Sequence, residues 1–175
     1  LIVMKIELNS KLLQAVSGLF LLAIAIVWMA CDPFELYAFS WLPGLFLLLG
    51  ALSLAGASYL GKMDGRLATK AVFYLLYAIL FFTVDVLVVN IYFVALWAMI
   101  EGAWLAQGGA IMRKNGENNW FIPICVGALI VVLAFICNYV TSSLVMIGVV
   151  FLFVALGQML PFVNDYLPKI DIEKK

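Results

Sequence analysis

The fold is decided by residues 71–112, AVFYLLYAILFFTVDVLVVNIYFVALWAMIEGAWLAQGGAIM, a block of 42 residues that is apolar almost throughout. A single helix of this length would be about 63 Å long, about twice the thickness of the hydrocarbon core of a bilayer. The block must therefore fold back on itself, and the polar residues near its centre indicate where. We predict a tight turn at Val86–Asn90, next to Asp85, between two membrane-spanning helices at about 71–86 and 91–112.

The composition of the whole chain agrees with a membrane location. Of the 175 residues, 67% are apolar and 11% are charged, and the mean hydropathy is +1.16. Soluble domains are roughly half apolar and a quarter charged. Ten basic and ten acidic side chains cannot cover the outside of a water-soluble fold of this length. We therefore expect an integral membrane protein, and the absence of net charge gives no indication of a nucleic-acid partner.

Four further apolar stretches complete the predicted set of spans. The first contains 19 residues without a charge and is too long for the core of a signal peptide, so we expect it to be retained, with Met4 as the initiator. The connections are short, which makes consecutive helices antiparallel. We predict an all-α bundle of six transmembrane helices in three consecutive hairpins, forming one domain over residues 1–175. The four further spans are 12–30, 36–60, 121–137 and 144–162.

The basic residues of the chain all fall on one side of this predicted topology. Lys70, for example, is assigned to the loop before the third helix. The opposite turns carry Asp32, Glu35 and Asp85 without a basic residue. Because basic loops stay in the cytoplasm, both termini are predicted to be cytoplasmic. The complete basic set is Lys5, Lys11, Lys62, Arg66, Lys70, Arg113, Lys114, Lys169, Lys174 and Lys175.

Small residues recur at similar places in the predicted hairpins. A shift of 52 residues aligns Gly50 with Gly102 and Gly56 with Gly108. Lipid gives helices no hydrophobic reason to associate, so small residues that allow close backbone approach supply the packing. The predicted packing positions are Gly44, Gly50, Ser53, Ala57, Gly61, Gly102, Ala106 and Gly108.

Several of these features resemble the HdeD family, which comprises small six-helix bacterial inner-membrane proteins named for acid resistance. They are the three hairpins with short outer turns, Gly18 in the first helix, Asp32-Pro33 in the first outer turn, and Gly44 and Gly50 in the second helix. The resemblance covers about residues 18–160, although the other two outer turns lack the proline. It implies a multi-pass location in the bacterial cytoplasmic membrane and a role in envelope stress, and it supplies no catalytic residues.

Glu101 is the candidate functional residue. It lies eleven residues from Asn90 and eleven from Met112, which places it near the midplane of the bilayer. Acidic residues at that depth face the bundle interior or a wet cavity and often mark ion or proton pathways. They also hydrogen-bond neighbouring helices in a purely structural role, and both interpretations stay open. The polar residues that could partner Glu101 are Gln14, Gln107 and Gln158.

A candidate pocket surrounds this acid. Helical spacing puts Trp97, Glu101 and Trp104 on one face, and Gln107 lies nearer the cytoplasmic end. Two indole rings and an acid suit a cation or an amphiphile. The predicted lining residues are therefore Trp97, Trp104 and Gln107.

Catalysis and metal binding are not expected. The chain has no histidine, and its three cysteines lack metal-ligand spacing, so no metal or cofactor is predicted. Whether Cys31 and Cys137 form a disulfide stays open. The predicted function is a non-enzymatic HdeD-like stress protein of the membrane. The alternatives are a small channel or transporter that uses Glu101, and an accessory subunit of a larger complex. The expected partners are the lipid bilayer and either further copies of the chain or a larger membrane complex.

Overall fold

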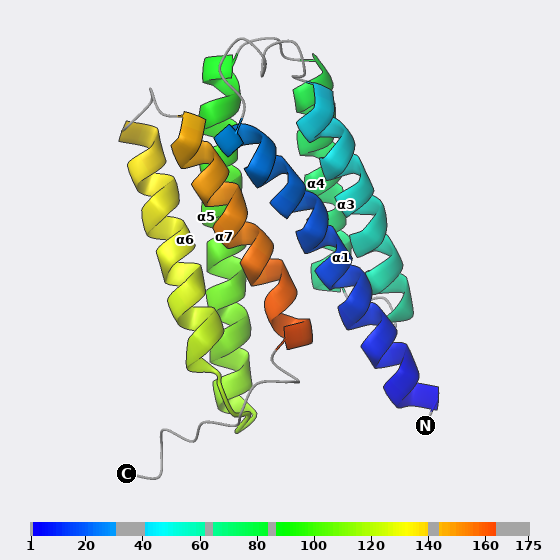
Figure 1. Cartoon of the computed structure of the whole chain (residues 1–175). Coiled ribbons are helices and arrows are strands. Elements are labelled where there is room, and N and C mark those ends of the chain that lie inside the picture. The colour runs from blue at the N-terminus through cyan, green and yellow to red at the C-terminus, as the bar shows by residue number, and fades with distance from the viewer. Residues whose placement is uncertain (1, 31–40, 62–64, 84–86, 140–143, 164–175) are drawn as a thin grey trace.

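The computed structural model describes residues 2–30, 41–61, 65–83, 87–139 and 144–163. This part of the chain is all-α and contains six helices, as predicted (Figure 1). Five of them are long and apolar enough to cross a membrane, whereas the apolar segment Phe121–Cys137 is shorter. The six helices are α1 (Ile2–Ala30), α3 (Trp41–Leu60), α4 (Gly65–Thr83), α5 (Leu87–Lys114), α6 (Phe121–Tyr139) and α7 (Leu144–Val163).

The central apolar block folds back as predicted, but the predicted turn at Val86–Asn90 is wrong for most of its length. Helix α5 begins at Leu87, so residues 87–90 are helical, and residues 84–86 lie outside the described part. A helix in a bilayer satisfies its own backbone hydrogen bonds, so a single polar residue such as Asn90 does not interrupt it. The first helix likewise begins well before residue 12, and the start predicted at residue 36 lies outside the described residues.

Helix α4 also differs from the prediction, because it begins at Gly65 rather than at residue 71. The segment between these positions was assigned to a loop because it carries Arg66 and Lys70. Long basic side chains can extend from a helix while their stems lie along apolar surface, so they do not end it. Lys70 is therefore a helix residue and not a loop residue, which changes its chemical environment completely.

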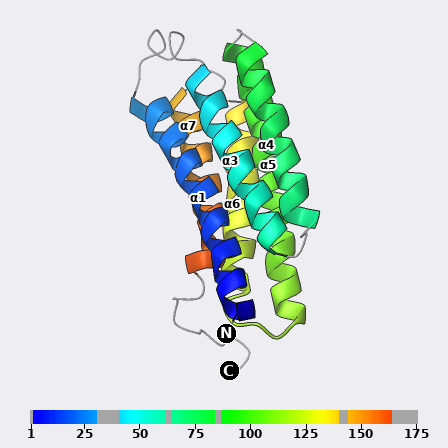
Figure 2. The same cartoon turned by 90° about the vertical axis from the view of Figure 1, so that its right-hand side faces the viewer.

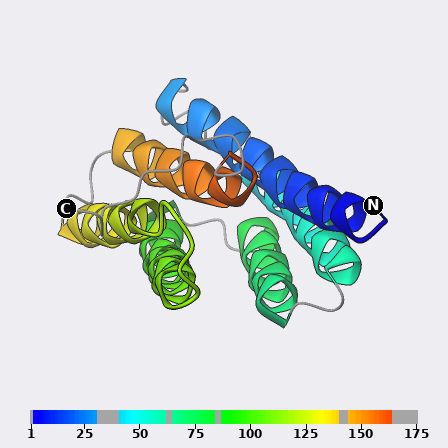
Figure 3. The same cartoon turned by 90° about the horizontal axis from the view of Figure 1, so that it is seen from below.

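The six described helices lie in a ring in the order α1, α3, α4, α5, α6 and α7, in which α4 and α5 meet through side chains without close backbone packing. The first helix, α1, packs against α3 and most extensively against the last helix, α7, which closes the ring. The views from the side and from below show this order (Figures 2 and 3). Helices α3 and α4 form another close pair, and so do α5 and α6. The closest packing thus falls partly between the three predicted hairpins rather than within them.

Small residues make these close pairs possible. A Cβ built at Gly18 of α1 would lie 2.9 Å from the carbonyl oxygen of Ala155 in α7, and one built at Gly102 of α5 would lie 2.6 Å from that of Gly127 in α6. A Cβ at Gly44 of α3 would lie 3.2 Å from the carbonyl oxygen of Ala78 in α4. The helix backbones touch at these points, as expected for association without a hydrophobic driving force.

The predicted packing residues have different roles in the structure. Gly50 contacts the ring of Tyr74, and the carbonyl oxygen of buried Ala57 accepts a 2.8 Å hydrogen bond from Ser10 Oγ of α1. The Ser53 hydroxyl donates to the Leu49 carbonyl within its own helix. Three positions remain. Gly61 adjoins Ser10 Oγ, Ala106 adjoins Gly127, and Gly108 has nothing within 4 Å of the position that a Cβ would occupy.

Aromatic rings fill the boundary between α4 and α5. Tyr74 and Trp97 pack edge to face with ring centroids 5.4 Å apart, and Phe73 and Trp104 do so at 5.6 Å. Tyr77 contacts the Trp97 ring at 6.0 Å. Because these rings stand between the helices, α4 and α5 are not among the pairs with close backbone packing. This aromatic boundary separates the two helices that were predicted to form the second hairpin.

The connection from α5 to α6 makes a first testable prediction. Gly116 has a φ of 69°, its N–H donates to the Arg113 carbonyl, and the Glu117 N–H donates to the Met112 carbonyl, which together form a Schellman cap. A side chain at this left-handed position costs about 1 kcal/mol. Gly116→Ala should lower the unfolding free energy by about that amount in denaturant titrations of the protein in mixed micelles. Gly65→Ala is the control, because nothing lies within 4 Å of its Cβ position and its φ is not positive. Equal losses in both variants would contradict the assignment.

Candidate functional site

A buried ion pair joins helices α4 and α5. The ammonium nitrogen of Lys70, Nζ, donates a 2.8 Å hydrogen bond to Oε2 of Glu101. The two residues are only 9% and 2% exposed. Glu101 therefore faces the bundle interior, as its place near the middle of an apolar helix requires.

Two glutamines extend this pair across the bundle. The side-chain amide of Gln158 in α7 donates a 2.7 Å hydrogen bond to the same Oε2 atom of Glu101. Gln14 of α1 in turn donates to the Gln158 amide oxygen over 3.4 Å. Four helices thus contribute to one polar cluster, Gln14, Lys70, Glu101 and Gln158. Of the three predicted partners of Glu101, Gln158 contacts it directly. Gln14 is connected to Glu101 only by its hydrogen bond to Gln158, and Gln107 is exposed.

Sequence reasoning missed Lys70 because it assigned every basic residue to a loop. A charge can lie inside a membrane protein when an opposite charge and further hydrogen bonds compensate its desolvation. The two partners are 31 residues apart on different helices, so no local spacing rule connects them. One signal was present, since Lys70 directly precedes the central apolar block and Glu101 is the acid within the second half of that block.

The second carboxylate oxygen of Glu101, Oε1, is buried and has no hydrogen-bond partner among the described residues. The Tyr74 hydroxyl and the Trp97 indole nitrogen are in the same condition. Trp97 lies one helical turn from Glu101, and its ring packs against that of Tyr74. Buried polar atoms normally find partners, so the unsatisfied Oε1 atom of Glu101 is the position at which a further polar group could bind. A cavity of about 10 Å³ beside Lys70, Glu101 and Gln158 is about the size that one water occupies.

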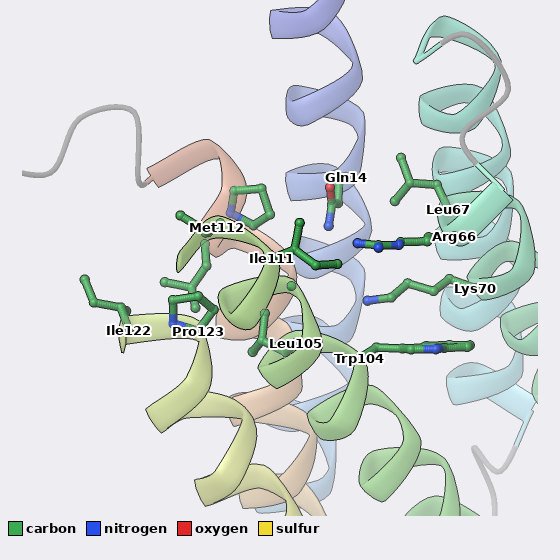
Figure 4. Close-up of a pocket in the computed structure, with 13 residues that line it drawn as sticks. Gln14, Arg66, Leu67, Lys70, Trp104, Leu105, Ile111, Met112, Ile122 and Pro123 are labelled. Atoms are coloured by element: carbon green, nitrogen blue, oxygen red, sulfur yellow. The ribbon is translucent and has the colours of Figure 1, made fainter. Parts of the chain in front are cut away.

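A larger pocket of about 310 Å³ opens beside this polar cluster. In Figure 4 the side chains of Arg66 and Lys70 extend from α4 toward Leu105 and Ile111 of α5. Lys70 belongs to both the pocket and the ion pair, and its Nζ lies 5.7 Å from the centre of the Trp104 ring. The pocket is lined by Gln14, Arg66, Leu67, Lys70, Trp104, Leu105, Gly108, Ile111, Met112, Ile122, Pro123, Leu160 and Pro161.

The structure places the three predicted lining residues in different environments. Trp104 lines the pocket. Trp97 instead lies in the core, 1% exposed, with its ring 5.3 Å from that of Phe151. Gln107 is exposed and does not line the pocket. Gly108, which was predicted to pack against another helix, is part of the pocket wall.

The predicted outer acids Asp32, Glu35 and Asp85 lie outside the described residues, and so does Cys31. Cys137 is a buried free cysteine, and Cys125 is exposed. Within the described ranges, no group of three or more His, Cys, Asp or Glu residues is placed to hold a metal ion.

Comparisons of the chain with family models, curated proteins and solved structures found no match. The described part of the chain therefore contains six helices, five of which are candidate membrane spans, and no family is identified.

Proposed function

We propose that this polytopic membrane protein is a small, non-catalytic transporter that couples the binding of a solute in the pocket to proton uptake at Glu101. The observation that carries the proposal is the position of Lys70. Its ammonium group lines the 310 Å³ pocket and also forms the buried ion pair with Glu101. A change of charge at Glu101 therefore changes the charge that a solute meets in the pocket.

The coupling follows from the two oxygens of the carboxylate. Oε2 accepts hydrogen bonds from Lys70 and Gln158, whereas Oε1 has no partner among the described residues and is the position open to a proton. Tyr74 of α4 packs on Trp97, which lies one helical turn before Glu101, and Ile130 of α6 lines the small cavity beside this carboxylate. When Oε1 takes up a proton, the neutral acid no longer balances Lys70. The ammonium charge is then available to an anion in the pocket, so that proton and solute bind together.

The pocket is proposed to open toward the cytoplasm. Its lining includes the first turns of α4 and α6 and the last turns of α5 and α7, which meet at the same end of the bundle as the start of α1 (Figure 1). Arg66, Arg113 and Lys114 lie at this end. By the positive-inside rule this end faces the cytoplasm.

The experiment is proton flux into liposomes that contain the purified protein and the trapped pH dye pyranine, measured after an external pH step. Glutamate, succinate, octanesulfonate, choline and glucose are supplied in turn as solutes. Flux above that of empty liposomes is expected with at least one solute, and Glu101→Gln should reduce it to the empty-liposome rate. Glu117→Gln is the matched control, because Glu117 is an exposed acid in the α5–α6 connection.

Folding of the variants is checked by circular dichroism and gel filtration. If Glu101→Gln alone does not fold, the double variant Lys70→Gln/Glu101→Gln removes both charges at once. Its proton flux should also equal that of empty liposomes. Wild-type protein that moves no protons with any of these solutes overturns the proposal, and so does a fully active, folded Glu101→Gln variant.

The envelope-stress role and the bacterial inner-membrane location that the HdeD resemblance implies stay predictions. The same holds for a role as an accessory subunit or a homo-oligomer. The described part of the chain contains no contact that favours these roles over the transporter.

A further inference from the structure

We infer that the small cavity of about 10 Å³ beside Glu101 binds one water molecule, and that this water passes protons between Oε1 of Glu101 and the wide pocket of about 310 Å³. The proton-transfer step rests on the proposed function, because it names the route by which Glu101 takes up a proton. The water site itself is a property of the polar cluster and is tested without any transport measurement.

The small cavity has the size and the lining of a water site. Its volume is about that of a single water-sized probe, so it has room for one water and no larger ligand. A buried water needs several polar partners, and cavities with apolar walls alone stay dry. Polar side chains of Lys70, Glu101 and Gln158 supply such partners here. The rest of the lining is formed by Leu105, Ile130, Val154 and Gly157.

Two of the lining residues offer hydrogen bonds of opposite sense. Oε1 of Glu101 is buried and has no partner among the described residues, so it accepts an O–H of the water. The Lys70 ammonium donates to Oε2 and has further N–H donors, one of which can bind the water oxygen. A water held in this way removes the cost of leaving a carboxylate oxygen buried without a hydrogen bond.

Only side chains separate the small cavity from the wide pocket. Lys70 and Leu105 line both spaces, and both are labelled at the wide pocket in Figure 4. Leu105 follows Glu101 by one helical turn and is partly exposed. Partly exposed leucine side chains change rotamer on a fast timescale. A movement of Leu105 therefore brings the bound water into contact with water in the wide pocket.

This contact gives a proton path that needs no other reactant. The bound water accepts a proton on its oxygen from a hydronium ion in the wide pocket and gives one of its own O–H protons to Oε1. The bound water is restored, and the Glu101 carboxylate becomes a neutral acid. Transfer through one intervening water is within the reach of acid–base groups in proteins. The reverse sequence returns the proton to the wide pocket.

Gly157 supplies the decisive variant. A Cβ at this position would lie 2.9 Å from Cδ2 of Leu105 and 3.5 Å from Cδ1 of Ile130, and all three residues line the small cavity. Both atoms are the ends of flexible side chains, so Gly157→Ala should fold with its methyl group in the space of the water. Gly56→Ala is the matched control. Its Cβ would also meet only the end of a leucine side chain, Leu13 at 3.2 Å, and Gly56 lines neither space.

The test is solid-state NMR of the whole protein in liposomes, in which magnetisation is transferred from water protons to nearby labelled groups. The chain has three glutamines, Gln14, Gln107 and Gln158, so an isotope label in the glutamine side-chain amides gives one signal for each. Replacing Gln14 and Gln107 by Met in turn assigns the signals. Gln158 is 2% exposed, yet it should receive magnetisation from water as Gln14 does at the wide pocket. In Gly157→Ala the transfer to Gln158 should be lost and that to Gln14 kept, whereas Gly56→Ala should change neither.

Two results would overturn the water site. One is wild-type protein in which Gln158 receives no magnetisation from water, because the small cavity is then dry. The other is a Gly157→Ala protein in which the transfer to Gln158 is kept, because the water then lies elsewhere. If Gly157→Ala does not fold, Val154→Ile adds one carbon at another lining position and should give the same loss.

The proton flux assay separates this inference from the proposed function. Gly157→Ala should lower the flux and Gly56→Ala should not. Full flux in a Gly157→Ala protein that has lost the water overturns the proton path and leaves the transporter standing. A wild-type protein with water at Gln158 and no flux overturns the transporter and the proton path, and leaves the water site standing.

Discussion

Replacing Lys70 by Met is expected to lower the unfolding free energy by about 3–5 kcal/mol, since it leaves the Glu101 carboxylate buried without its counter-charge. The reverse change, Glu101→Leu, should cost less. Lys70 lies five residues into α4, about 7.5 Å along the axis from its start, so the released ammonium can extend to the end of the bundle. Glu101 has a shorter side chain and lies deeper in the bundle, so its carboxylate cannot reach the end of the bundle in the same way.

The double variant Lys70→Met/Glu101→Leu should recover most of the loss, because two apolar side chains replace two charges that otherwise need each other. Unfolding is measured by titration with SDS in mixed micelles, and Lys114→Met, which changes an exposed residue at the end of α5, is the control. Additive losses in the double variant would show that the two charges are stabilised separately. The ion pair would then have no role in holding α4 to α5.

The contact between α5 and α6 gives the second large effect. A Cβ at Gly127 would collide with the carbonyl oxygen of Gly102 and would lie 2.8 Å from the backbone nitrogen of Ala106. These obstacles are backbone atoms, so a side chain can be accommodated only if the helices move apart. We expect Gly127→Leu to lower the unfolding free energy by about 3 kcal/mol or more, because separation of the helices also disturbs neighbouring contacts.

Gly108→Ala is the control for this variant, because it adds a methyl group on α5 where there is open space. It should change the unfolding free energy by less than about 0.5 kcal/mol in the same SDS titration. A Gly127→Leu protein as stable as the Gly108→Ala protein would mean that α5 and α6 do not touch through their backbones.

The number of helices in the described part of the chain was predictable because it depends on length and hydrophobicity alone. The block 71–112 is too long for one span, and this constraint holds whatever the neighbours of each helix are. The exact turn within the block was not predictable in the same way. Asn90 looked like a boundary, but one polar side chain does not outweigh the backbone hydrogen bonds of a helix in lipid.

The polar cluster was only half predictable. Glu101 could be singled out because a carboxylate inside an apolar helix is costly wherever the helix lies. Its partner depends on which faces of α4 and α5 meet, and these helices are apolar on most sides, so their sequences carry little information about orientation. The pocket could not be predicted either, because it also depends on which helix faces meet. Its walls come from five helices, and the open space at Gly108 exists only once they are assembled.

The pairing of α1 with α7 has a consequence for how the protein is made. Among the described helices, α1 is synthesised first and α7 last, and α1 has its most extensive contacts with α7, through Gly18 and Ala155 at one level and Ala25 and Gly148 at another. Until α7 has entered the membrane, this face of α1 and the Gln14 side chain lack their final neighbours. We therefore expect early intermediates of biogenesis to expose a polar, glycine-containing surface, and the contact between α1 and α7 to form only when synthesis has passed α7.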